Sequence, residues 1–529
     1  MLPGYLLLAA FTTTPLAPLD SVPLFDNLGT HSREITTAVP MAQRYFNQGL
    51  RLVYGFNHVE AVRAFTRATQ LDPACAMCYW GLAYAHGPHV NAGMDSAAAI
   101  QAYAAIRKAQ DVAGGAAAWE RAYITALATR YAAVPQADRS ALDSAYATAM
   151  GQVAARYPDD LDAATLYAEA LMDLRPWNYW TPSGEPQPGT TEIVSQLERV
   201  IQRNPNHPGA CHYYIHAVEA VAPELAVPCA ERLAQLMPGV GHMVHMPAHI
   251  YIRVGRYADA IVANEHAVHA DESYIDNQRP QGLYRLGYYP HNYHFLAFAA
   301  TMAGRRSQAL QAARDLATKV PAEFAEQSPE AQSWMVFPML TLTTFGAWDE
   351  VLAAPAPPES QWFGHALAQY ARGVALAALG RGSEARPLVA SIATAASAAP
   401  DGDPKTALMI AQHALLGEID ARSGNDASAI AHFQEAARLE DTMLYYEPPV
   451  WFYPIRHSLG AALLRAGRYP EAERVYREDL KRFPMNGWSL FGLGKALRAL
   501  GRESEADVVD AQFLQAWMSA DVQLTASRF

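Results

Sequence analysis

Small residues, an aromatic residue and a proline recur along this chain at fixed intervals, and this periodicity constrains its fold more than any other feature. Counted from Ala42, the pattern occupies positions 8, 20, 24, 27 and 32 of a unit, with Gly49, Ala61, Phe65, Ala68 and Pro73. Small residues at 8, 20 and 27 let two helices approach closely, and the aromatic residue at 24 fills the space between neighbouring helix pairs. The spacing predicts a helix–turn–helix unit.

The same pattern returns in the C-terminal part of the chain. Gly460 and Gly494 are 34 residues apart, which is the period of the tetratricopeptide repeat (TPR). The residues that fit it are Gly373, Gly380, Ala385, Gly417, Gly424, Ala429, Phe433, Ala436, Gly460, Gly467, Tyr469, Ala472, Tyr476, Pro484, Gly494, Gly501 and Ala506. We predict an all-α fold, a TPR-type α-solenoid in which helix–turn–helix repeats build a right-handed superhelix.

The domain organisation follows from breaks in this pattern. We expect a signal or leader segment at 1–22, a TPR-like superhelix with a histidine-rich concave groove at 23–352, a Pro-rich joint at 353–360 and a C-terminal TPR array at 361–529. No Lys or Arg precedes the apolar start, which counts against a secretory signal. The chain is periplasmic or extracellular if that segment is a signal, and cytoplasmic otherwise.

Charge and composition limit the function. The formal net charge is -12 and we find no run rich in Lys or Arg, so we expect no nucleic-acid partner. No apolar run reaches the roughly 18 residues that span a bilayer, so we expect no membrane span. We find no phosphate-binding loop, nucleophile elbow or dinucleotide fingerprint, and the His212–His216 pair lacks the glutamate of a zinc-protease helix. Whether the protein is an enzyme stays undecided.

Histidines concentrate between His207 and His294 and fall at helical intervals. Residues three, four and seven apart share one face of a helix. When the residues are aligned to the repeat, the histidines of the set below fall on the free face of the first helix of successive units. The carboxylate of Glu219 falls on the same face. The predicted set is His212, His216, Glu219, His242, His245, His249, His291 and His294.

This set predicts a site for a transition metal ion, Cu, Zn or Fe. Neutral imidazoles are good ligands for such ions, and Glu219 would serve as a ligand or as a partner behind the ligands. Two alternatives remain open: the histidines form hydrogen bonds in a polar core, or they line a substrate groove without a metal. Long aromatic loops at 174–192 and 270–290 could cover the site.

Other histidines and the cysteines give weaker signals. His266 and His269 fall on the second helix of a unit and should face outward or pack, and His413 and His457 should be structural. Cys75 and Cys78 form a buried pair of thiols, a disulfide or a metal thiolate pair, with His58, His86 and His89 nearby in sequence. Cys211 and Cys229 should lie on neighbouring helices.

Several stretches resemble a group of bacterial TPR proteins with histidine-rich central repeats. They are AQRYFNQGLRLVYGFNHVEAVRAF, CAMCYWGLA, HYYIHAVEA, GHMVHMPAHIYIRVGRYADAI, YYPHNYHF and EPPVWFYPIR, and the similarity covers roughly residues 29–500. The resemblance implies the same superhelix. We know of no established reaction for that group, so it assigns no catalytic residue, and this chain has His89 where the group leads us to expect Asn.

We therefore predict a TPR scaffold that binds a transition metal ion in a histidine-lined groove. The alternative is a module for protein–protein interaction or self-assembly, able to form filaments and without metal chemistry. A second alternative is an oxidative metalloenzyme, which needs an open coordination position and a substrate pocket. The partners implied are a metal ion, a peptide or protein, and further copies of the chain.

Overall fold

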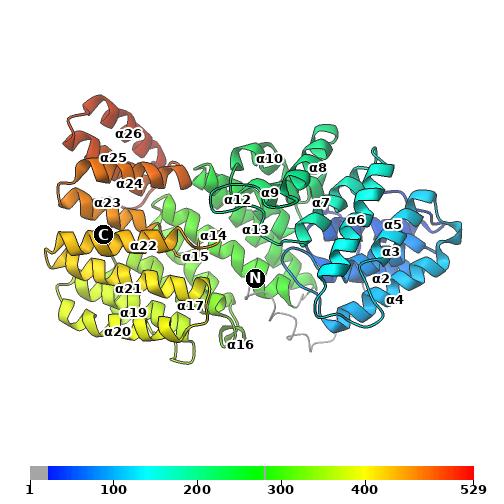
Figure 1. The fold of residues 1–529 in the computed structure, drawn as a ribbon, viewed down its shortest axis with the longest axis horizontal. Coiled ribbons are helices and arrows are strands. Elements are labelled where there is room, and N and C mark those ends of the chain that lie inside the picture. The colour runs from blue at the N-terminus through cyan, green and yellow to red at the C-terminus, as the bar shows by residue number, and fades with distance from the viewer. Residues whose placement is uncertain (1–21, 279–281) are drawn as a thin grey trace. The chain divides into compact units, whose positions relative to one another are not determined.

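The computed structural model describes residues 22–278 and 282–529, and over these ranges the regular structure is helical, with two isolated β-bridges (Figure 1). The chain forms two compact units. The first comprises Met1–Ile250 and His266–Tyr289, and the second comprises Tyr251–Glu265 and Pro290–Phe529. The predicted all-α, TPR-type architecture is confirmed. The expected leader at 1–22 lies outside the described residues except for Val22.

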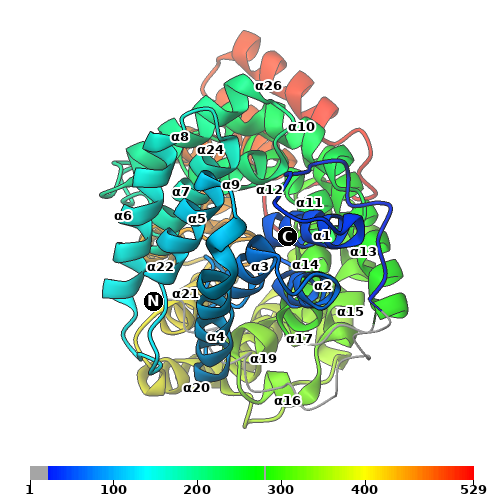
Figure 2. The same cartoon turned by 90° about the vertical axis from the view of Figure 1, so that its right-hand side faces the viewer.

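Helices of the first unit follow one another as pairs. They are α1 (Pro40–Tyr54), α2 (His58–Leu71), α3 (Ala76–Ala85), α4 (Ser96–Val112), α5 (Ala118–Ala128), α6 (Ser140–Arg156), α7 (Leu161–Asp173), α8 (Thr190–Arg203), α9 (Pro208–Val218), α10 (Val227–Leu236) and α11 (Gly241–His245). Helices α12 (Pro247–Arg253) and α13 (Tyr257–Gln278) contribute residues to both units. Successive helices α1 to α4 pack side by side, as Figure 2 shows.

The second unit continues the pattern. Its helices are α14 (Tyr289–Met302), α15 (Arg306–Lys319), α16 (Ala322–Ala325), α17 (Pro329–Thr344), α18 (Trp348–Ala353), α19 (Trp362–Ala378), α20 (Gly382–Ala398), α21 (Asp403–Arg422), α22 (Asp426–Glu440), α23 (Ile455–Arg465), α24 (Tyr469–Arg482), α25 (Gly487–Ala499) and α26 (Glu503–Ala516). Neighbours in the run α19 to α22 pack together. Among the helices of the described ranges, none has the length and apolar character to cross a membrane.

Contacts between glycines and aromatic rings explain the repeat pattern. A Cβ added at Gly49 would come within 2.6 Å of the Phe65 ring, and one at Gly81 would come closer still to the same ring. In the second unit the Tyr476 ring fills the equivalent space between Gly460 and Gly492. The aromatic residue of one repeat therefore packs against the small residues of its own repeat and of the next, as the spacing predicts.

The Pro-rich run at 353–360 lies inside the second unit. Helices α17 and α18 precede it, and both pack against α19, which follows it. Gln332 Oε1 on α17 accepts hydrogen bonds from the backbone N–H groups of Phe363 and Gly364, at 3.0 and 3.3 Å. The boundary between the two compact units falls earlier in the chain, between Ile250 and Pro290.

The two segments expected to be long loops differ. Residues 174–189 do form a loop between α7 and α8. The loop predicted at 270–290 is wrong for most of its described length, because α13 runs on to Gln278 and residues Tyr284–Tyr288 form a π-helix. No proline or glycine stands between Tyr257 and Gln278, so nothing in the sequence ends that helix earlier.

An extended segment, residues 22–37, lies along α1 and is held by amide side chains. Gln48 accepts from the N–H of Phe25 at 2.8 Å and donates to the carbonyl of Pro23 at 2.9 Å. Gln43 accepts a hydrogen bond from the N–H of Ile35 at 3.0 Å and donates one to the carbonyl of Arg33 at 2.8 Å. Each amide thus satisfies one donor and one acceptor of a backbone that has no helical partners of its own.

Candidate metal centre

Three helices of the first unit bring five predicted histidines together. Helix α9 carries His212 and His216, α11 carries His242 and His245, and α12 carries His249. Helix α9 begins at His207, whose Nδ1 accepts the N–H of Ala210 at 3.1 Å, and Pro208 occupies its first position. The i, i+4 spacing then places His212 and His216 on one face. The same spacing relates His245 to His249.

We call these five residues, with Glu219, the histidine cluster. Their side chains are buried, with between 0 and 5 % of each residue exposed. The imidazole centroids follow one another around a closed circuit: His212–His216 at 4.9 Å, His216–His249 at 5.6 Å, His249–His245 at 4.8 Å, His245–His242 at 6.1 Å and His242–His212 at 4.9 Å. Histidines from two of the three helix pairs that were predicted to supply ligands therefore do meet.

Ring nitrogens within the cluster face one another. His212 Nε2 lies 3.2 Å from His216 Nε2 and 3.1 Å from His242 Nε2, and these three ligand atoms all fall within 4.8 Å of one another. In a tetrahedral site with metal–nitrogen bonds of about 2.0 to 2.1 Å, neighbouring nitrogens lie about 3.3 Å apart. The two distances from His212 Nε2 are already close to that spacing. His245 Nε2 and His249 Nε2 are 2.9 Å apart.

Hydrogen-bond acceptors behind the imidazoles decide which nitrogens carry protons. His212 Nδ1 lies 2.6 Å from the carbonyl oxygen of Tyr54. His216 Nδ1 lies 3.2 Å from Glu219 Oε1, and His249 Nδ1 lies 2.7 Å from Glu219 Oε2. Carbonyl and carboxylate oxygens only accept, so all three Nδ1 atoms must donate. In a neutral imidazole the proton at Nδ1 leaves a lone pair on Nε2.

Burial keeps the imidazoles of His212 and His216 neutral. It lowers the pKa of His216 to about 3. Burial, followed by the neighbouring His216, holds the pKa of His212 well below its ordinary value. Two Nε2 lone pairs therefore face each other across 3.2 Å, which is a repulsive contact unless a cation stands between them. Nitrogens oriented in this way by acceptors behind them are typical of metal-binding histidines.

Aromatic side chains enclose the cluster. The Phe56 ring lies with its centroid 4.4, 5.5 and 6.0 Å from those of His212, His242 and His216. Trp177 points its ring edge at His216 from 4.8 Å, and Tyr288 lies 4.6 Å from His242. The two aromatic segments predicted to cover the site therefore contact it. Their indole and phenol groups are anchored, because Trp177 Nε1 donates to the carbonyl of Val90 and Tyr288 accepts from Asn91.

Backbone strain gathers at the same place. Among the described residues, three that are not glycine have a positive φ, and two of them, Phe56 at 56° and Trp177 at 62°, touch the cluster. Bulky side chains rarely adopt this conformation, which costs on the order of 1 to 3 kcal/mol. Tyr288 belongs to the π-helix, another feature frequent at functional sites. These signals are independent of the histidines and could not be read from the sequence.

The other predicted ligands are Glu219, His291 and His294. Glu219 accepts from two Nδ1 atoms, so it stands behind the ligand nitrogens. His291 and His294 lie on α14 in the second unit, where the His291 ring is 5.0 Å from Phe295 and that of His294 is 4.7 Å from Phe337. Burial lowers the pKa of His294 to about 3. Their role as ligands stays a prediction.

Five further histidines lie away from these ligands or on other helix faces. His266 and His269 are exposed on α13. His457 is buried and lies with Nε2 3.1 Å from Asp479, and His413 contacts His432 through their Nδ1 atoms at 3.1 Å. His58 lies with Nδ1 3.1 Å from the carbonyl of Ala85.

Cysteine chemistry is settled for one pair. Cys75 and Cys78 are joined in a disulfide, so the metal thiolate alternative is wrong. Cys211 and Cys229 are buried free thiols on α9 and α10, and a hydrogen bond with Cys229, together with burial, raises the pKa of Cys211.

A second group, His31, Asp162 and His207, was missed by sequence reasoning. Asp162 Oδ1 accepts from Tyr54 at 2.6 Å and lies 3.0 Å from His31 Nε2 and 3.3 Å from His207 Nε2. Arg33 donates to its other oxygen at 3.0 Å. Because His207 Nδ1 accepts from Ala210, its Nε2 must carry the proton. Burial alone would raise the pKa of Asp162, but hydrogen bonds from His207 and His31 and the charge of Arg33 lower it well below its ordinary value. The carboxylate is already satisfied, which argues against a metal there.

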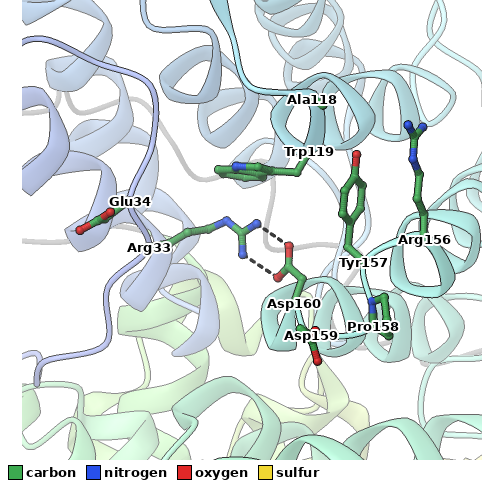
Figure 3. A pocket seen from close by; sticks show the side chains of 9 residues that line it. All are labelled: Arg33, Glu34, Ala118, Trp119, Arg156, Tyr157, Pro158, Asp159 and Asp160. Atoms are coloured by element: carbon green, nitrogen blue, oxygen red, sulfur yellow. Dashed lines mark hydrogen bonds and ion pairs between the residues drawn. The ribbon is translucent and has the colours of Figure 1, made fainter.

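A pocket of about 600 Å³ lies beside this group (Figure 3). Its central charge is Arg33, which lies 4.0 Å over the Trp119 ring and forms two hydrogen bonds with Asp160, at 2.7 and 2.5 Å. Asp159 pairs with Arg203 at 2.8 Å. The charged groups that line this pocket thus largely neutralise one another. This leaves the histidine cluster as the stronger candidate for a functional site.

No protein-family model matches the chain, and no curated protein matches it. Among solved structures, the chain is similar to a human IFIT1 dimer with m7Gppp-AAAA, with 11% identity, 92% of each chain covered and a TM-score of 0.33. It is also similar to the Cut9–Hcn1 hetero-tetramer of the APC/C (12% identity, 90% of this chain and 94% of that chain, TM-score 0.31) and to yeast Tom70 (11% identity, 90% of each chain, TM-score 0.31). These values carry no inference about ligands or partners, and the TPR-type fold rests on the helix pairs and glycine–aromatic contacts of the chain itself.

Proposed function

We propose that this protein is a TPR-type scaffold that binds a transition metal ion through Nε2 of His212, His216 and His242. The observation that carries the proposal is the set of converging Nε2 atoms, at 3.1 and 3.2 Å, together with the acceptors that His212 and His216 have at Nδ1. A polar core made only of hydrogen bonds would pair a donor with an acceptor at each contact. Here the His212–His216 contact pairs two acceptors.

The types of donor atom limit which metal ions fit the site. Three imidazoles without a thiolate suit Zn or Cu, and Fe is also bound by imidazole. Glu219 and the Tyr54 carbonyl would fix the orientation of the ligands without touching the ion. Burial of the cluster and its aromatic walls support an ion that is held tightly and exchanges slowly.

Metal content tests the proposal directly. Protein purified without a tag, or apo protein reloaded with Zn²⁺ or Cu²⁺, should retain at least one ion per chain after dialysis, measured by elemental analysis. The His212→Ala/His242→Ala variant should lose it. His413→Ala is the matched control, because it removes a histidine from another close imidazole pair, His413–His432, and should leave the content unchanged. Wild-type protein without bound metal after reloading would end the proposal.

A second candidate function is self-assembly, and it is supported by an exposed apolar surface at the C-terminal helix. Val508, Leu514 and Met518, on and just after α26, are 61%, 69% and 85% exposed. Exposed apolar side chains on a solenoid helix favour stacking on another copy. Light scattering should show concentration-dependent oligomers that Leu514→Glu/Met518→Glu abolishes. A monomer at every concentration would exclude this candidate.

A further inference from the structure

We propose that the histidine cluster is a dinuclear centre, in which His245 and His249 hold a second metal ion beside the one held by His212, His216 and His242. This inference rests on the proposed function and goes beyond it, because it assigns two ions and divides the five imidazoles between them. Five buried nitrogen donors exceed what one ion in a tetrahedral site can use.

The argument is an internal symmetry of the cluster. His212 and His216 are an i, i+4 pair, and His245 and His249 are another on the next hairpin. Each pair brings its two Nε2 atoms together, at 3.2 Å in the first and 2.9 Å in the second. Both spacings are close to those of neighbouring ligands on one ion.

Glu219 extends the symmetry behind the ligands. Its Oε1 lies 3.2 Å from Nδ1 of His216, and its Oε2 lies 2.7 Å from Nδ1 of His249. The second histidine of each pair therefore donates to one oxygen of the same carboxylate and turns an Nε2 lone pair toward its own partner. Glu219 therefore orients one histidine of the His212–His216 pair and one histidine of the His245–His249 pair.

The two halves are adjacent. Imidazole centroids are 5.6 Å apart between His216 and His249 and 6.1 Å apart between His242 and His245. Two cations at this range repel each other, and Glu219 is the carboxylate that stands between the two pairs. We therefore expect sequential loading, with the trio filled first and the His245–His249 pair filled second and more weakly.

Stoichiometry is the first test. Apo protein dialysed against excess Zn²⁺ should hold two ions per chain, and His245→Ala should hold one. His212→Ala/His242→Ala should lose the tighter ion, and His413→Ala should still hold two. One ion in the wild type would overturn the dinuclear inference and leave the proposed function standing, whereas no ion would overturn both.

Magnetic coupling is the second test, and it reports how close the two ions lie once both are bound. With two Cu²⁺ per chain, adjacent ions should couple, so that the integrated electron paramagnetic resonance signal is well below the copper content. His245→Ala should restore a full signal from one copper per chain. A hydrogen bond from His245 to His249 is the competing account of their 2.9 Å contact, and it predicts one uncoupled copper in both proteins.

Folding is checked with a milder variant. His245→Gln keeps a polar side chain of similar length and should also bind one ion, with a circular dichroism spectrum that matches the wild type. Two coupled ions in a folded His245→Gln protein would mean that this residue is not a ligand, and the assignment would fall.

Discussion

At the scale of single residues, the candidate site depends on which nitrogen of each histidine carries the proton. The i, i+4 spacing let sequence reasoning identify both histidine pairs and the nearby Glu219. It could not identify the Tyr54 carbonyl, because a backbone acceptor leaves no mark in the sequence. The group formed by His31, Asp162 and His207 was missed for a related reason, since 131 residues separate His31 from Asp162.

Glu219→Gln should weaken metal binding about 10- to 100-fold. A glutamine oxygen can accept from one Nδ1–H, but its NH2 group would face the other and force that imidazole to move its proton to Nε2. Competition with a chelator of known affinity measures the change. Glu198→Gln is the control, because Glu198 accepts a hydrogen bond from Tyr214 away from the cluster and should not alter affinity. Equal affinity in Glu219→Gln would remove the orienting role.

Asp162→Asn should destabilise the fold most near neutral pH. The folded-state pKa of Asp162 is lowered, so its charge contributes stability above the unfolded value of about 3.9, and this contribution is lost as pH falls through the lower folded value. The loss of these charge-assisted hydrogen bonds should cost about 1.5 to 3 kcal/mol at pH 7, because Arg33 keeps its two bonds to Asp160. Urea unfolding from pH 7 down to about 3 should show the difference between variant and wild type shrinking. A difference independent of pH would contradict this account.

At the scale of helices, the repeat pattern was sufficient to predict the fold wherever glycines meet an aromatic ring. Phe65 and Tyr476 each fill the space that the spacing assigns to them. The predicted loop at 270–290 failed because the prolines and glycines of this segment begin only at Pro280, while the residues from Tyr257 to Gln278 have no helix breaker. Nor does a π-helix at Tyr284–Tyr288 have a periodic signal that sequence reasoning could use.

Gly81→Ala should destabilise the first unit although alanine favours helices. The added Cβ would clash with the Phe65 ring, and overpacking of this kind costs about 1 to 3 kcal/mol, against a gain of up to about 1 kcal/mol from helix propensity. Gly382→Ala is the control, because the nearest neighbour of its Cβ is Ile419 at 3.8 Å, and it should be neutral or slightly stabilising. Thermal unfolding measures both. Rescue of Gly81→Ala by Phe65→Leu would confirm the cause.

At the scale of the whole molecule, the histidine cluster ties together segments that are distant in sequence. It joins the end of α1, through the Tyr54 carbonyl, with α9, α11 and α12. Sequence reasoning could assign each histidine to a helix face but not decide which faces meet, because that depends on the packing of consecutive repeats. Sequence reasoning therefore named five ligands that the structure brings together. It did not foresee the position of the boundary between the two units.

Removing the metal should loosen these segments selectively. A ligand at 100 times its dissociation constant stabilises the folded state by about 2.7 kcal/mol, so chelation should raise hydrogen exchange in α9, α11 and the turn after Tyr54. Helices α19 to α22 of the second unit serve as the internal reference, and their exchange rates should be the same with and without the metal. Mass spectrometry of peptides compares the metal-loaded and apo proteins. A uniform change along the chain, or none, would argue against a locally bound ion.

The extended segment along α1 has a consequence for sequence variation. Gln43 and Gln48 recognise it through backbone carbonyl groups, which every residue possesses, and N–H groups, which every residue except proline possesses. The side chains at Pro23, Phe25 and Ile35 can therefore change while the attachment persists, whereas the two glutamines cannot. Divergence should thus be greater at these three positions than at the two glutamines that hold them.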